Sequence, residues 1–200
     1  MKRVLLLSFS PHGSAARSFQ LARDLLREHL PDATIIERDY GSTPAAPISR
    51  EYAMAVTTRA LPDPGAVSIS EQLINEVEAC DLLILCTPLH NFTVPATLKI
   101  WIDQVVRIQR SFAINERQEK IGLLEDTPTW VLVSSGGAIK GHPAHQADFL
   151  SPYLRVILGT VGIHSVEFVY LASLLHGEQS AEQSLAQARA QLSDLLRYSV

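Results

Sequence analysis

The first segment suited to chemistry is residues 8–18, which is rich in hydroxyls and small residues and leads into a helical pattern. Its ligand-binding side chains would be Ser10, Ser14, Arg17 and Ser18. Such side chains, together with the backbone N–H groups at a helix start, can hold a phosphate. Helix capping by Ser10 or Ser14 is the alternative. Because a cap explains one serine rather than three with an arginine, we expect a phosphate site.

A second segment, residues 87–92, follows another apolar run and offers surface for a flat ring. Leu89 and Phe92 supply apolar area, and the Asn91 amide supplies both a hydrogen-bond donor and an acceptor. His90 is a candidate proton donor here, although a lone histidine more often packs or binds water.

The third segment, residues 134–137, reads Ser-Ser-Gly-Gly. Its two glycines let main-chain N–H groups approach a ligand without interference from a side chain. A plain tight turn is the alternative for such a pair. Ser134 and Ser135 are not expected to be nucleophiles, because no G-x-S-x-G motif surrounds them.

Other phosphate and metal signatures are missing. Neither G-x-G-x-x-G after the first strand nor G-x-x-x-x-G-K-[ST] occurs, which disfavours a dinucleotide fold and a P-loop. His142 and His145 are separated by Pro143 and lack a third ligand, so we expect no metal. The remaining histidines need no special role in this interpretation: His12, His29, His164 and His176.

These three segments need a scaffold that brings them together, and the apolar pattern predicts one. Short apolar runs near residues 4–7, 34–36, 82–86, 130–133 and 166–170 are typical of strands covered on both faces, as in parallel sheets. The last run alternates, which is typical of an edge strand. Helical stripes between runs predict helices on both sheet faces. In such an open α/β sheet, ligands bind beyond the carboxyl ends of the strands.

Two long segments lack this succession of apolar runs and helical stripes, at residues 41–64 and 111–128, and we expect both to be irregular. Long loops in a compact domain are usually binding loops or lids. Surface decoration or subunit contacts are an equal alternative.

The composition restricts the class of protein and the kinds of binding partner. The chain has 200 residues, of which 46% are hydrophobic and 19% charged, which suits a single domain spanning residues 1–200. A net charge of −4 disfavours binding to nucleic acid or to a membrane. No stretch is long enough for a membrane span or a secretion signal. Two cysteines beside apolar residues, Cys80 and Cys86, suit a reducing cytoplasm.

Together, these segments resemble the FMN-dependent NAD(P)H azoreductase and quinone reductase family, whose fold is a flavodoxin-like, doubly wound, five-stranded parallel sheet. Residues 88–92 are similar to the family's P-M-Y-N-F segment, and residues 134–137 to its S-R-G-G turn. Ser10 and residues 18–21 resemble its phosphate loop, and residues 148–169 resemble its C-terminal segment. The resemblance covers nearly the whole chain.

The resemblance implies roles for matching positions. Ser10, Arg17 and Ser18 would hold the FMN phosphate. Gly136 and Gly137 would donate N–H groups to the flavin N1/O2 edge, where a fixed positive dipole stabilises negative charge on the reduced ring. Pro88, Leu89, Asn91 and Phe92 would line the flavin ring, with Asn91 hydrogen bonded to it. The other expected cofactor-binding residues are His90, Ser134 and Ser135. The chain departs from the family at Ala16, His90 and Ser135, where serine, tyrosine and arginine are usual.

The activity implied is a two-electron ping-pong reaction. NADH or NADPH would pass a hydride to FMN, and a quinone or azo compound would then be reduced at the same site. A homodimer is implied, with the flavin pocket at the subunit contact. The alternatives are a general FMN or nitro reductase, a flavodoxin-type electron carrier, and an FMN-binding regulatory protein. Carriers tend to be strongly acidic, so a charge of −4 disfavours that class.

Overall fold

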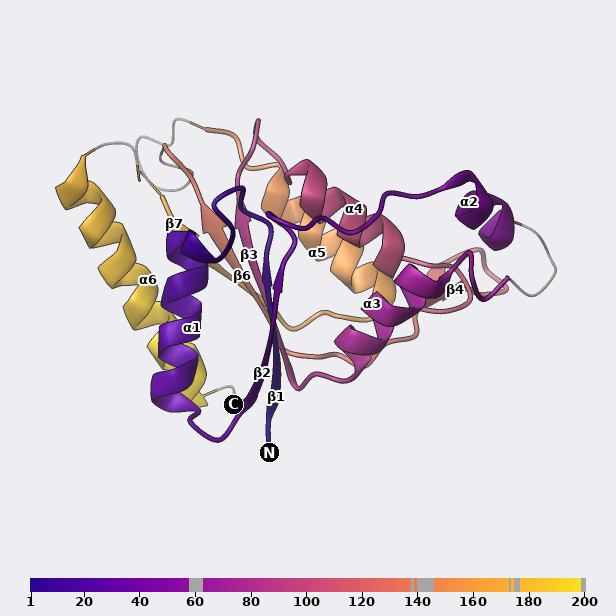
Figure 1. Ribbon diagram of the computed structural model, residues 1–200, viewed down its shortest axis with the longest axis horizontal. Helices are drawn as coiled ribbons and strands as arrows, with labels where there is room; N and C mark the ends of the chain where they lie inside the picture. The colour runs from indigo at the N-terminus through magenta and orange to yellow at the C-terminus, as the bar shows by residue number, and fades with distance from the viewer. Residues whose placement is uncertain (58–62, 138, 140–145, 173, 175–176, 199–200) are drawn as a thin grey trace.

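The predicted apolar runs form one five-stranded parallel sheet in the computed structural model, which describes residues 1–200 except 58–62, 138, 140–145, 173, 175–176 and 199–200 (Figure 1). The strand order is β2-β1-β3-β6-β7, and every neighbouring pair is parallel. The flavodoxin-like sheet is therefore confirmed, with β7 at an edge as its alternation predicted. The strands are β1 (Arg3–Ser8), β2 (Thr34–Asp39), β3 (Leu82–Pro88), β6 (Thr129–Ser134) and β7 (Val166–Leu171).

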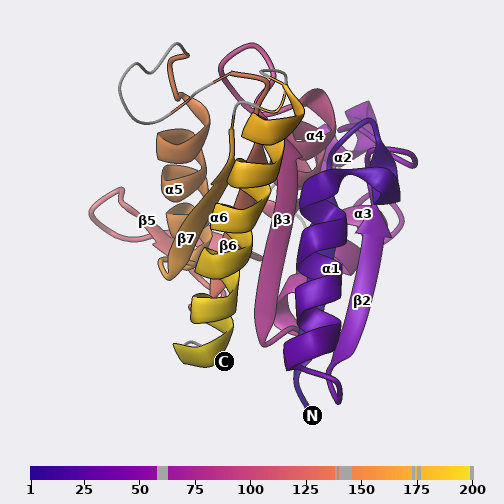
Figure 2. The same ribbon diagram turned by 90° about the vertical axis from the view of Figure 1, so that its left-hand side faces the viewer.

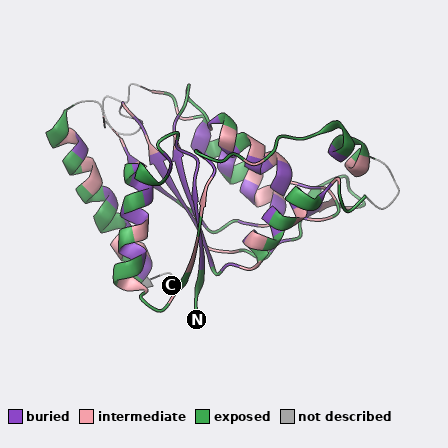
Figure 3. Ribbon diagram, in the orientation of Figure 1, coloured by how far each residue is buried: buried purple, intermediate pink, exposed green. Residues whose placement is uncertain are grey.

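The central strands are continuously apolar because helices cover both faces of the sheet. Along β1, Leu5 and Leu7 pack into one buried cluster, whereas Val4 and Leu6 pack into the other. Successive side chains of a strand point to opposite faces, so a strand buried on both sides needs an apolar residue at each position. Figure 3 shows the buried residues concentrated on the sheet and on the helix faces turned toward it.

Among the described residues, five helices form the two outer layers (Figures 1 and 2). Helices α1 (Arg17–His29) and α6 (Glu178–Tyr198) lie side by side over one face. The other face is covered by α3 (Ser68–Glu78), α4 (Ala96–Val105) and α5 (Leu150–Val161). The predicted placement of helices on both faces is confirmed. No helix in the described part of the chain is both long and apolar enough to cross a bilayer.

The expectation that residues 41–64 and 111–128 are irregular is wrong in part. The first segment contains helix α2 (Arg50–Thr57), in which Tyr52 is the buried residue, so the sequence shows no apolar stripe there. The second contains an antiparallel hairpin of β4 (Phe112–Ile114) and β5 (Lys120–Gly122). The β5 residues are all exposed. Buried and exposed positions therefore do not alternate along this strand, and the sequence shows no alternation of apolar and polar residues there.

An ion-pair cluster ties α3 to the chain that follows α4. The Arg110 guanidinium contacts a Glu71 carboxylate oxygen at 2.8 Å and a Glu78 oxygen at 2.6 Å. Arg107, which is buried, also pairs with Glu71. Hydrogen bonding to Arg110 is the main cause that lowers the pKa of both glutamates. The cluster therefore favours the folded state when these carboxyl groups are ionised.

We expect Arg110→Gln to reduce the pH dependence of stability in acid. A lowered pKa in the folded state means that the contribution of Glu71 and Glu78 is present above their unfolded pKa, about 4.3, and is lost as the pH falls through the folded pKa. Urea denaturation at pH 7 and pH 3.5 should therefore show a smaller difference for Arg110→Gln than for the wild type.

Arg197→Gln is the matched control, since Arg197 forms an exposed pair with Asp194 at 3.8 Å. It should leave the pH dependence unchanged, because exposed ion pairs contribute little. An Arg110→Gln protein with the wild-type difference between the two pH values would contradict the role given to the cluster.

Candidate functional site

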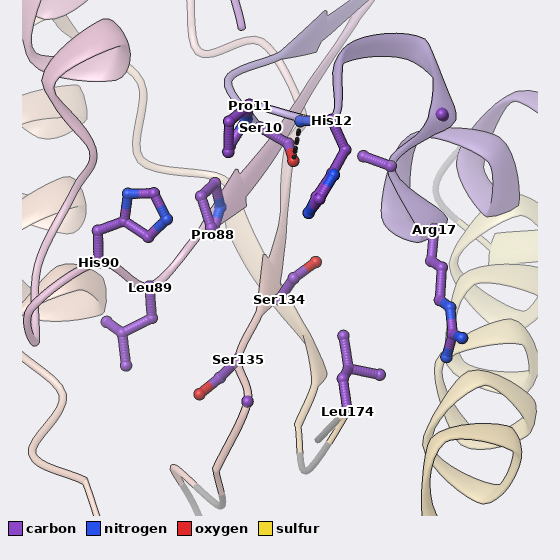
Figure 4. A pocket seen from close by; sticks show the side chains of 13 residues that line it. Ser10, Pro11, His12, Arg17, Pro88, Leu89, His90, Ser134, Ser135 and Leu174 are labelled. Atoms are coloured by element: carbon purple, nitrogen blue, oxygen red, sulfur yellow. Dashed lines mark hydrogen bonds between the residues drawn. The ribbon is translucent and has the colours of Figure 1, made fainter. Parts of the chain in front are cut away.

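A pocket of about 530 Å³ lies beyond the carboxyl ends of β1, β3 and β6 (Figure 4). Its size is within the range of small-molecule and cofactor sites. The structure thus brings together the three segments that the sequence singled out. The lining residues are Ser10, Pro11, His12, Ala15, Ala16, Arg17, Pro88, Leu89, His90, Ser134, Ser135, Gly136 and Leu174.

The loop after β1 presents the N-terminus of α1 to this pocket. Ala16 is the N-cap residue, and no side chain in the described part of the chain caps the helix. The Ser10 hydroxyl accepts the His12 N–H at 3.2 Å, whereas the Ser14 N–H is donated to Asp39. Because Ala16 occupies the N-cap position, neither Ser10 nor Ser14 is the N-cap of α1, contrary to the capping alternative. An uncapped helix N-terminus carries partial positive charge and suits an anion.

Close backbone packing fixes the shape of this loop. Gly13 has a φ of +54°, and a Cβ atom there would lie 2.3 Å from Asp39 Oδ2. A Cβ atom on Gly41 would lie 1.7 Å from the Ser10 carbonyl oxygen. Asp39 also accepts hydrogen bonds from the Ser42 N–H and hydroxyl. The chain after β2 thus holds the loop after β1 in place.

The loop after β3 ends in a tight turn that separates its predicted site residues. His90 and Thr93 exchange two backbone hydrogen bonds of 3.0 Å, and Asn91 and Phe92 occupy the turn with φ of +46° and +71°. Leu89 and His90 line the pocket, whereas Asn91 and Phe92 are exposed and do not. Left-handed conformations in non-glycine residues store strain of about 1–2 kcal/mol each, a feature that clusters at functional sites.

The loop after β6 is supported by Gln146. The Ser135 hydroxyl donates to Gln146 Oε1 at 3.1 Å and accepts the Gly137 N–H at 3.3 Å. A Cβ atom on Gly137 would lie 2.8 Å from Gln146 Nε2. Gly137 therefore packs against Gln146 rather than lining the pocket, whereas Ser134, Ser135 and Gly136 line it.

Two residues expected to bind phosphate have other surroundings. Ser18 is buried and does not line the pocket. Its hydroxyl hydrogen bonds to the Cys86 thiol, whose pKa is raised by burial. Arg17 lines the pocket, but Figure 4 shows its guanidinium extending toward α6 and away from Ser10.

Comparison with known proteins agrees with this fold. The family model described as "Flavodoxin-like fold" matches residues 2–196. The chain belongs to this flavodoxin-like family. The chain is also similar to "FMN-dependent NADH:quinone oxidoreductase 4" of Pseudomonas fluorescens, with 44% identity over 196 residues, which are 96% of this chain and 95% of the relative.

Solved structures of other proteins share the flavodoxin-like architecture. An azoreductase from Bacillus anthracis superposes with a TM-score of 0.83 at 20% identity, covering 98% of this chain and 99% of that one. An FMN-dependent NADH-azoreductase from the same species, in complex with FMN, gives a TM-score of 0.80 at 16% identity, covering 98% and 100%. At these identities the likeness concerns the fold.

Sequence reasoning missed His12 and Leu174, which line the flavodoxin-like pocket. The sequence interpretation gives His12 no special role, whereas the structure places it in the wall of the pocket. Its position within residues 8–18 was the available signal. Leu174 follows the edge strand β7 and had no motif around it. The described residues contain no group of three metal-binding side chains, and His142 and His145 lie outside those residues.

Proposed function

We propose that this flavodoxin-like chain is an FMN-dependent NADH:quinone oxidoreductase that also accepts azo compounds. The observation that carries the proposal is the convergence of three loops on one pocket, with an uncapped helix N-terminus in its wall. Full-length similarity to an FMN-dependent NADH:quinone oxidoreductase at 44% identity supports it.

The pocket residues fit FMN. The N-terminus of α1 and Ser10 supply donors for the phosphate, since an uncapped helix start is an anion site. Leu89, which is 9% exposed, supplies an apolar wall for the ring. Gly136 places main-chain atoms at the pocket without a side chain. When bound, FMN accepts a hydride from NADH and delivers two electrons to the acceptor.

The side chains of the pocket orient the reactants and restrict the access of water to the site. Pro88, Leu89 and Leu174 give apolar surface to the pocket, which strengthens electrostatic interactions inside it. We propose that His90, whose imidazole stands beside Pro88 in Figure 4, supplies the proton for quinone reduction. Asn91 and Phe92 lie on the adjacent turn and are proposed to contact the ring at the pocket rim.

A homodimeric, single-domain cytoplasmic enzyme is part of the proposal. Phe92 and Phe149 are 50% and 63% exposed, and the Phe149 N–H donates to the Phe92 carbonyl at 3.1 Å. These exposed aromatic rings beside the pocket loop support a subunit contact there. Cys80 and Cys86 are buried free thiols, which supports a reducing compartment.

Steady-state oxidation of NADH tests the activity. The FMN-loaded protein should oxidise NADH with menadione, a quinone, or with an azo dye, and without any protein partner. FMN-loaded protein that transfers electrons only to a partner protein would instead be a carrier. FMN-loaded protein with no turnover on any acceptor would support the regulatory alternative and contradict the proposal.

A further inference from the structure

The His12 imidazole enters the pocket from the loop after β1 (Figure 4). Backbone contacts hold its position, because its N–H donates to the Ser10 hydroxyl at 3.2 Å and its carbonyl accepts the Ala15 N–H at 3.0 Å. The residue has φ of −83° and ψ of 0° directly before the short 3₁₀ helix η1 (Gly13–Ala15). The ring thus projects from a fixed backbone next to the start of α1.

The charged groups around His12 leave the ring free to meet an anion. Asp39, at the end of β2, directs its carboxylate to the Ser14 N–H and to Ser42. Arg17, on α1, extends toward α6, and His90 stands on the opposite wall of the pocket (Figure 4). The uncapped start of α1 adds partial positive charge on the same side as His12.

We propose that His12 is a phosphate-binding residue whose ring N–H donates to a phosphate oxygen of the cofactor. This inference rests on the proposed FMN site. His12 thus has the phosphate-binding role that the sequence resemblance implies for Arg17. The His12 ring points into the pocket, whereas the Arg17 guanidinium does not. A hydrogen bond to a charged oxygen is stronger than one between neutral groups. His12 therefore contributes to the preference for FMN over riboflavin, which has the same ring but no phosphate.

Paired titrations with FMN and riboflavin test this role without any turnover. Flavin fluorescence gives the Kd of each ligand for the wild type, for His12→Ala and for His12→Gln. Loss of one charge-assisted hydrogen bond should raise the FMN Kd of His12→Ala by about tenfold. The riboflavin Kd should change by less than about twofold, because the lost partner is the phosphate. His12→Gln retains an N–H donor and should lose less FMN affinity than His12→Ala.

His29→Ala is the matched control, since His29 lies in the last turn of α1, at the opposite end of the helix. It should leave both Kd values unchanged. Equal losses of FMN and riboflavin affinity in both His12 variants would overturn the inference, as would wild-type affinity for both ligands. In either case, a wild type that binds FMN leaves the proposed function standing. A wild type that binds neither flavin overturns both.

Discussion

Ala16→Asp is expected to abolish tight FMN binding while it stabilises the protein without ligand. Ala16 is the N-cap of α1, with an extended backbone (φ −60°, ψ 130°) and no side-chain cap. An aspartate there accepts first-turn N–H groups, which should raise the free energy of unfolding by about 1 kcal/mol. Its charge would also lie at the proposed position of the phosphate, and like charges in close contact cost several kcal/mol. The FMN Kd should therefore rise by about 100-fold or more.

Ala16→Ser separates the two effects, because its hydroxyl can cap the helix or donate to phosphate without adding charge. Its FMN Kd should stay within about threefold of the wild type. Flavin titration and urea denaturation measure both quantities. Wild-type FMN affinity in Ala16→Asp would show that the phosphate does not bind at the start of α1.

Gly41→Ala is expected to lower the free energy of unfolding by about 3 kcal/mol, the upper range for overpacking. The added Cβ atom would lie 1.7 Å from the Ser10 carbonyl oxygen and 2.6 Å from its carbon, and both are backbone atoms. The Ser10 carbonyl also accepts the Gly13 N–H at 2.8 Å. Displacement of Ser10 would therefore reshape the loop before α1, and FMN affinity should fall as well.

Gly65→Ala is the matched control for Gly41→Ala. A Cβ atom on Gly65 would first meet Asp63 Oδ1 at 3.5 Å, which is an ordinary contact. Its stability should stay within about 0.5 kcal/mol of the wild type, as for most surface substitutions. If both variants unfold at the same urea concentration, the close approach between Gly41 and Ser10 is not needed for stability.

The sequence predicted the sheet well because its strands are buried on both faces. Val4, Leu5, Leu6 and Leu7 have no exposed surface, so the apolar run and the strand coincide. The rule that ligands bind at the carboxyl ends of parallel strands then located the site. Twelve of the residues that line the pocket lie in the three segments chosen from the sequence, and these include Ser10, Pro88 and Gly136.

Other features depend on contacts that no local pattern encodes. Gly41 does not have a positive φ. Glycine is required at this position because the backbone of Ser10, which is distant in sequence, lies too close for a Cβ atom. The side chain of Arg17 turns toward α6, an element formed by the end of the chain. Helix α2 buries Tyr52 alone, so the apolar stripe that revealed α1 and α4 is missing there. Tertiary packing decides such positions, and sequence periodicity does not report it.

Titration of the purified wild-type protein with FMN, followed by visible absorbance and by flavin fluorescence, tests the central claim most directly. The account predicts saturable binding of one FMN per chain and weaker binding of riboflavin, because the α1 N-terminus is the proposed site of the phosphate. A protein that shows no affinity for FMN would contradict the account. Equal affinity for FMN and riboflavin would contradict the placement of the phosphate.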